Sequence, residues 1–144
     1  MTPDVNVLVA AFRPDHPHHR RARSWLDEAR AACVAGQDSL RVLPMVLAGF
    51  LRLVTNSRVF AEPDSVEDAV SFAQSLLATP GTELAACGQE WPLLREKLLE
   101  HSLDGNKIPD AWIAACVEYL GEHLVTFDRD FHRLLHARAH TVLA

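Results

Sequence analysis

The stretch Lys107–Asp130 reads KIPDAWIAACVEYLGEHLVTFDRD and predicts a helix followed directly by a strand. Its apolar positions recur at helical spacing as far as Leu120, and Gly121 is typical of a residue just beyond a helix end. The run HLVTF at 123–127 has the apolar character of a buried strand. Asp128 follows at once, so we expect its carboxylate at the carboxyl edge of a sheet.

The same alternation of helical and strand patterns continues through the rest of the chain. The predicted strands are short apolar runs, and the predicted helices carry apolar residues three and four positions apart. Strands separated by helices indicate an α/β fold in which helices pack on a mainly parallel sheet. We predict further strands at 5–12, 40–43, 82–86 and 140–143, and helices at 15–35, 45–55, 64–77, 89–101 and, shorter, 128–135.

Two of these helix starts are assigned from capping residues. Asp15 precedes the helical pattern that continues to Ala35, and Asp64 is followed three residues later by Glu67, the spacing of a capping box. We therefore expect both aspartates to accept hydrogen bonds from the first turns of their helices.

The composition is typical of one domain over residues 1–144. The chain is 49% hydrophobic, which suffices for a sizeable core. No apolar run approaches the roughly 20 residues of a membrane-spanning helix, and the N-terminus lacks a signal-peptide pattern. We therefore expect a cytoplasmic protein with no membrane partner.

The net charge of −5 disfavours a broad basic surface that binds nucleic acid by its own charge. An acidic protein that acts on nucleic acid needs a local device instead. Clustered carboxylates that bind a divalent cation are such a device, because the cation reverses the local field where a phosphate must lie.

Several carboxylates are placed for such a site. Ligands of open parallel sheets bind outside the carboxyl ends of the strands, and Asp128 and Asp130 follow a predicted strand there. Asp110 lies in the first turn of a helix, where the helix dipole favours negative charge. Asp4 precedes the first predicted strand, so the pattern places it at the opposite, amino end and does not bring it to the other acids.

Four segments of the chain stand out: DVNVLVAAF at 4–12, VLAGFLRLVTNSRVF at 46–60, GNKIPDAWIAACV at 105–117 and LVTFDRDF at 124–131. In this order they resemble the conserved blocks of PIN domains, specifically the VapC toxins of bacterial toxin–antitoxin pairs. One block alone is weak, whereas four in this order are specific and span nearly the whole chain. The resemblance implies a three-layer α/β/α sandwich and a metal-dependent endoribonuclease that cuts structured RNA such as tRNA or rRNA.

The resemblance also implies roles for the residues that match the family's motifs. Asn6 and Thr126 match polar residues that orient the metal-binding acids, whose oxygen ligands suit Mg²⁺ or Mn²⁺. The bound ion would lower the pKa of a water and neutralise charge on the phosphate. The catalytic, metal-binding acids of the family match Asp4, Asp110 and Asp128, with Asp130 as an accessory acid.

Partners follow from the same resemblance. We expect an RNA substrate, a small VapB-like antitoxin whose C-terminal segment lies across the acidic site, and a second copy of the chain in a homodimer. Arginine is the better bidentate partner of phosphate, and lysine a point charge. The candidate contacts to the RNA backbone are Arg52, Lys107 and Arg129.

One position departs from the family pattern. A Glu commonly stands just before the Phe-x-Arg segment of the second block, but here the residue is Gly49. The remaining acids can still bind a cation, and one ion instead of two stays an alternative. A catalytically silent PIN domain that binds RNA or a protein also stays open. A phosphatase of another α/β fold ranks last, because DVN does not supply its DxD motif.

Structural interpretations compete with these roles. Asp4 can be a surface acid, Asp110 a helix first-turn acid and Asp128 a turn acid. Three histidines near a helix start lack a sequence partner for metal binding, three tryptophans fit the core or a subunit interface, and three dispersed cysteines fit buried reduced thiols. These residues are His16, His18 and His19; Trp25, Trp91 and Trp112; and Cys33, Cys87 and Cys116.

Overall fold

The strands are short, and all of their pairings are parallel, as predicted. The computed structural model describes residues 1–144. The amide of Arg41 donates a hydrogen bond to the carbonyl of Met1 at 2.9 Å, so the second sheet adjoins the first. One sheet has the order β1 (Thr2–Pro3), β4 (Leu124–Thr126), β5 (His140–Val142), and the other pairs β2 (Leu40–Val42) with β3 (Thr82–Leu84).

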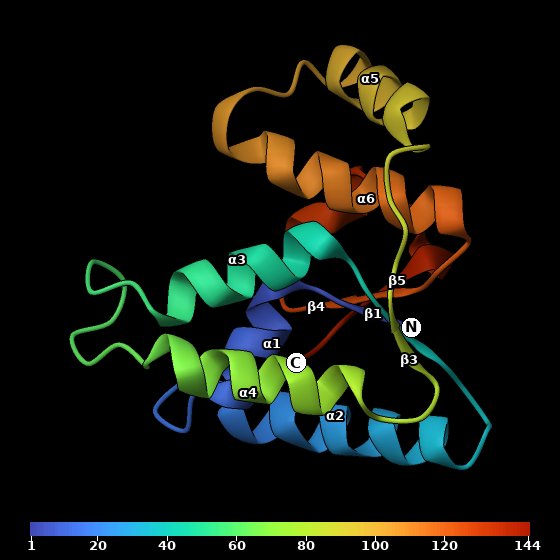
Figure 1. Cartoon of the computed structure of the whole chain (residues 1–144). Coiled ribbons are helices and arrows are strands. Elements are labelled where there is room, and N and C mark those ends of the chain that lie inside the picture. The colour runs from blue at the N-terminus through green and yellow to red at the C-terminus, as the bar shows by residue number, and fades with distance from the viewer.

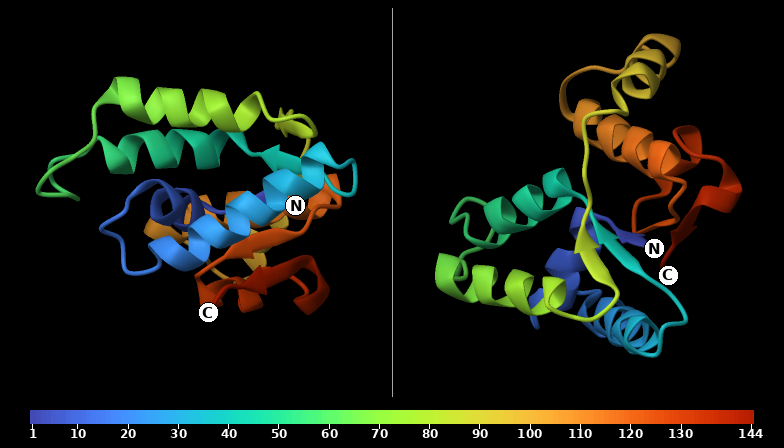
Figure 2. Two further views of the ribbon diagram at one scale, coloured as in Figure 1. Left: turned by 90° about the horizontal axis from the view of Figure 1, so that it is seen from below. Right: turned by 45° about the vertical axis from the view of Figure 1, so that its right-hand side comes forward.

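Helices flank the strands on both sides. In Figures 1 and 2, α5 and α6 lie on one side of the strands and α2 lies on the other, which confirms the sandwich arrangement. None of these helices combines the length and apolar character that crossing a membrane requires. The helices are α1 (Val5–Phe12), α2 (His19–Val34), α3 (Pro44–Val54), α4 (Val66–Leu77), α5 (Trp91–Glu100) and α6 (Ile108–Leu120), with 3-10 turns η1 (Gly105–Lys107), η2 (Arg129–Arg133) and η3 (Ala137–Ala139).

The segment 5–12 is a helix, so the prediction of a strand there is wrong. The Asp4 carboxylate accepts a hydrogen bond from the amide of Val5 at 2.7 Å and caps the helix start. A continuous apolar run does not distinguish a buried strand from a buried helix. Because the first strand is Thr2–Pro3, Asp4 follows it and lies at the carboxyl edge.

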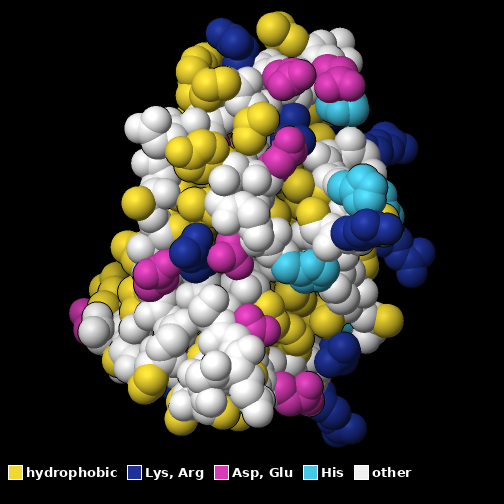
Figure 3. All heavy atoms as spheres, turned by 90° about the vertical axis from the view of Figure 1, so that its right-hand side faces the viewer, with side chains coloured by type: hydrophobic (Ala, Val, Ile, Leu, Met, Phe, Trp, Pro, Cys, Tyr) yellow, Lys and Arg dark blue, Asp and Glu magenta, His cyan; other side chains and the backbone are white.

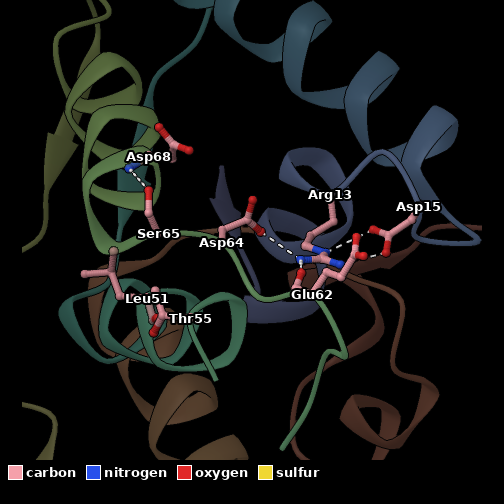
Figure 4. Close-up of polar contacts among 8 residues, drawn as sticks. All are labelled: Arg13, Asp15, Leu51, Thr55, Glu62, Asp64, Ser65 and Asp68. Carbon is pink, nitrogen blue, oxygen red and sulfur yellow. Dashed lines mark hydrogen bonds and ion pairs between the residues drawn. The ribbon is translucent and has the colours of Figure 1, made fainter. Parts of the chain in front are cut away.

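The two predicted capping aspartates have another partner. Helix α2 begins at His19 and not at Asp15, and Ser65, not Asp64, accepts the capping hydrogen bond of α4, from the amide of Asp68 at 3.1 Å. Both predicted caps are therefore wrong. The physical reason is Arg13, whose guanidinium binds both carboxylates (Figure 4).

Arg13 fastens the connection after α1 to the connection between α3 and α4. Its guanidinium donates to Asp15 at 2.6 and 3.0 Å, and to Asp64 at 2.9 Å. A further hydrogen bond of 2.8 Å reaches the carbonyl of Glu62, and the guanidinium carbon lies 3.9 Å from the ring centroid of Phe60. The hydrogen bonds that Arg13 donates to Asp15 lower the pKa of Asp15. The loop that carries Phe60 is thereby held in place.

Candidate active site

Asp4 is the most enclosed acid of the site. Asp4 is 4% exposed. One of its carboxylate oxygens accepts hydrogen bonds from Thr126 Oγ1 at 2.6 Å and from Asn6 Nδ2 at 3.0 Å. Burial raises the pKa of Asp4, against the lowering effect of these hydrogen bonds. The carboxylate is therefore fixed in one orientation.

Asn6 and Thr126 connect Asp4 to the end of β4. Asn6 Oδ1 accepts from the amide of Phe127 at 3.1 Å, and Asn6 Nδ2 donates to Thr126 Oγ1 at 3.2 Å. Thr126 Oγ1 also accepts from the amide of Asp128 at 3.0 Å. The two polar residues singled out in the sequence thus contact both the first acid and the segment that carries Asp128.

Asp128 and Asp130 lie directly after β4. Asp128 caps η2, because its Oδ1 accepts from the amide of Asp130 at 2.8 Å. Its side chain also lines a groove, so its role as a cap leaves it accessible there. Asp130 is exposed and lines a neighbouring, smaller cavity.

Asp110 joins these acids from α6. It lies in the first turn of the helix, half-buried, and lines both the groove and the smaller cavity. Burial, and then the charges of Asp4, Asp128 and Asp130, raise its pKa to about 6. Carboxylates from three separate segments therefore share one concentrated negative field.

The groove joins acidic, basic and apolar side chains. Its volume is about 560 Å³, and the smaller cavity measures about 230 Å³. Arg52 is exposed on the groove and Lys107 on the smaller cavity, whereas Arg129 is exposed but lines neither. Sequence reasoning missed Arg133, three residues after Asp130 in a predicted helical segment, which also lines the smaller cavity.

The PIN domain family matches residues 1–136 of this chain. Ribonuclease VapC31 of Mycobacterium tuberculosis is 39% identical over 138 residues, which cover 94% of this chain and 93% of that protein. This chain belongs to the VapC group of PIN domains.

Further comparisons agree with this assignment. Ribonuclease VapC25 of M. tuberculosis is 39% identical over 136 residues, covering 94% of this chain and 93% of the relative. VapC ribonuclease Mb2897 of Mycobacterium bovis is 38% identical over 137 residues, covering 94% and 90%. The crystal structure of VapBC2 from Rickettsia felis bound to a promoter DNA fragment has the same fold, with a TM-score of 0.64, 19% identity and coverage of 99% and 98%.

Gly49 has a packing role in this VapC fold. A Cβ atom at Gly49 would lie 3.0 Å from Cγ2 of Val5, closer than side chains normally approach. The glycine therefore lets α3 pack closely against the start of α1, directly after Asp4. A Glu at this position would require Val5 to move.

The oxygen donors of this VapC site fit a hard cation. The carboxylate oxygens of Asp4, Asp110 and Asp128 do not all lie within 4.8 Å of one another. The three carboxylates would hold such a cation, and Mg²⁺ in proteins is commonly bound by carboxylates together with waters.

One face of this VapC chain carries side chains of both charge signs. On the face in Figure 3, Lys and Arg side chains alternate with Asp, Glu and His, and no patch of one sign covers the face. This pattern agrees with the net charge of −5. The attraction of a nucleic acid to this face would therefore depend more on a bound cation than on a basic surface.

Proposed function

We propose that this chain is a metal-dependent endoribonuclease and the toxin of a type II toxin–antitoxin pair. The observation that carries the proposal is the convergence of Asp4, Asp110 and Asp128. Burial and the charges of the neighbouring aspartates together raise the pKa of Asp110 to about 6. The similar mycobacterial proteins are named ribonucleases, which supports the same activity here.

The catalytic acids act as ligands of Mg²⁺ or Mn²⁺, with Asp130 as an accessory acid. When bound, the ion supplies a water of lowered pKa and neutralises charge on the phosphate. Asn6 and Thr126 position Asp4 through hydrogen bonds of 3.0 and 2.6 Å, so this ligand needs little reordering when a cation arrives. Asp110 lines both cavities, so its carboxylate would be accessible from either side.

Basic residues beside the acids bind the RNA backbone. Arg52 on the groove and Lys107 on the smaller cavity are exposed cations at two sides of Asp110. Arg129 binds a phosphate further along the RNA chain. The substrate is a structured RNA such as tRNA or rRNA, in which an exposed loop enters the groove.

The groove also suits a VapB-like antitoxin. Apolar side chains line it beside the acids, so an antitoxin segment with apolar residues and a cation would fill it and cover the catalytic carboxylates. The structural neighbour from Rickettsia felis is a VapBC complex. The apolar residues that line the groove are Val5, Val9, Met45, Leu53, Val59, Phe60 and Ile113.

We further propose that the chain is a single PIN domain that works as a cytoplasmic homodimer.

The decisive experiment compares cleavage of total cellular RNA by the purified chain, freed of co-purifying protein, with Mg²⁺, Mn²⁺ or chelator. Asp110→Asn is the test variant and Asp104→Asn, an exposed acid six residues earlier, is the matched control. Discrete fragments that need the metal, vanish in Asp110→Asn and persist in Asp104→Asn support the proposal. Equal cleavage by both variants contradicts it.

Gly49 favours a second candidate function, a catalytically silent PIN domain that binds RNA or a protein. Val5 occupies the space that a ligand side chain at position 49 would need. Tight RNA binding by the wild-type chain, without cleavage under any metal condition, is the result that this alternative predicts.

A further inference from the structure

A second group of potential metal ligands lies away from the aspartates. The sulfur atoms of Cys87 and Cys116 and a carboxylate oxygen of Glu90 all lie within 4.8 Å of one another. Cys87 and Glu90 belong to the connection between β3 and α5, which passes α6 in Figure 1, and Cys116 lies in α6. The prediction that all cysteines are buried is wrong for Cys87, which is exposed because this connection lies on the surface.

The spacing of the two sulfurs fits a tetrahedral metal site. Cys87 Sγ and Cys116 Sγ are 3.7 Å apart. Two thiolates at the usual Zn–S distance of about 2.3 Å and a tetrahedral angle stand about 3.8 Å apart. A disulfide needs about 2.05 Å, so its formation would require the sulfurs to approach much more closely.

Glu90 supplies a fixed, buried carboxylate without a cationic partner. The residue is 2% exposed, and it forms no ion pair. Its two oxygens accept from Trp112 Nε1 at 2.7 Å and from the amide of Gly88 at 2.6 Å. Burial acts to raise the pKa of Glu90, but these hydrogen bonds outweigh it and leave the pKa lowered. A buried charge of this kind is commonly paired or bound to a metal.

The thiols are poor nucleophiles without a metal. Burial raises the pKa of Cys116 and of Cys87, and the charge of Glu90 adds to both effects. A divalent cation would release both thiol protons to solvent and offset the negative charge of the three ligands. The exposed Cys87 gives the ion access to the site.

We propose that Cys87, Glu90 and Cys116 bind one Zn²⁺ ion, with a water in the fourth position. Thiolate ligands select Zn²⁺ over the hard cations that suit the aspartates, so the two sites take different metals. The ion joins the β3–α5 connection to α6, the helix that carries Asp110. The small cluster of Leu94, Ala111 and Ala115 packs α5 on α6, and an ion pair between Lys97 and Glu118 also joins the two helices. The metal reinforces this unit.

The test titrates the full-length, reduced and metal-stripped chain with Co²⁺, which reports thiolate ligation by a charge-transfer absorption, and then displaces it with Zn²⁺. We expect one equivalent of Co²⁺ to produce the thiolate absorption, and we expect Zn²⁺ to raise the melting temperature of the chain. Cys87→Ser and Glu90→Gln should each weaken binding at least about 10–100-fold, the cost of losing even an outer-shell partner. Cys33→Ser, a buried cysteine elsewhere, should bind as the wild type does.

Three results would overturn the proposal. They are the absence of a thiolate–cobalt absorption in the folded wild type, unchanged Zn²⁺ affinity in Cys87→Ser, and equal loss in Cys33→Ser. A wild-type chain that binds no Co²⁺, but loses two hydrogens by mass when treated with a peroxide, would instead identify a redox-active cysteine pair. No RNA is used, so the outcome is independent of the proposed nuclease activity.

Discussion

Thr126 is the residue through which several parts of the acidic site contact one another. It is fully buried, and its hydroxyl donates to Asp4 while it accepts from Asn6 and from the amide of Asp128. Its loss would leave buried polar groups unpaired and let the Asp4 carboxylate rotate. An isosteric change at this position therefore tests positioning separately from metal ligation.

We expect Thr126→Val to lower both RNA cleavage and apparent Mg²⁺ affinity about 10–100-fold, because it removes the support of a ligand and not the ligand itself. Cleavage rates across a Mg²⁺ series measure both quantities. Thr126→Ser keeps the hydroxyl and should retain most of the activity. Wild-type Mg²⁺ dependence in Thr126→Val would show that Asp4 needs no such support.

Asp4 shows where inference from the sequence alone ends. Asp110, Asp128 and Asp130 were placed from local patterns, since each lies at a helix start or just after a strand. Asp4 contacts Thr126 across 122 positions of sequence, and no local pattern encodes that contact. Its inclusion in the site came from resemblance to PIN domains, and the structure explains it through a two-residue strand too short for a periodicity to reveal.

At the scale of elements, Arg13 holds two connections together. Its side chain is 8% exposed and binds two aspartates, one of which, Asp64, is 29% exposed. We expect Arg13→Ala to lower the free energy of unfolding by about 1–3 kcal/mol, because several hydrogen bonds to a charged group are lost. Limited proteolysis should then cut near Phe60, whose ring loses the guanidinium.

Arg23→Ala is the matched control for this prediction. Arg23 also pairs with an aspartate, Asp27 at 3.2 Å, but both side chains are about half exposed. An exposed pair of this type contributes about 0.3–0.5 kcal/mol. Chemical denaturation of the two variants compares them directly, and equal losses would mean that Arg13 does not fasten the loops.

The contact between α1 and α3 depends on Gly49. Alanine in a helix interior is more favourable than glycine by about 1 kcal/mol, but a Cβ here would lie 3.0 Å from Val5 Cγ2. We expect Gly49→Ala to stabilise the chain at least about 0.5 kcal/mol more in a Val5→Ala background than in the wild type. Urea unfolding of the four variants measures this coupling. Identical effects in both backgrounds would contradict the close approach.

The elements themselves were predictable to different degrees. The predictions of a strand at 40–43 and a helix at 108–120 are correct, because a short apolar run closed by Pro44 and a long helical spacing are strong signals. The segment 5–12 was assigned to the wrong class, since a fully buried helix shows no polar face. The caps at Asp15 and Asp64 failed because Arg13, distant in sequence, competes for both carboxylates.

At the scale of the whole molecule, the proposed function requires an acidic chain to bind RNA, an acidic polymer. With a net charge of −5, long-range attraction to RNA is weak, so affinity depends on the few cations beside the groove. Each phosphate contact releases counterions, and this release makes affinity fall with salt concentration. The slope of log affinity against log salt concentration therefore measures the number of phosphate contacts in the complex.

We expect Arg52→Ala, in an Asp110→Asn background that prevents cleavage, to weaken RNA binding and to reduce the slope of log affinity against log salt by about 0.7 for a single-stranded loop. Fluorescence anisotropy over a salt series gives this slope. Arg20→Ala, an exposed arginine on α2 that lines neither cavity, should leave it unchanged. If both substitutions reduce the slope equally, RNA contacts the molecule through its general charge and the groove does not set its position.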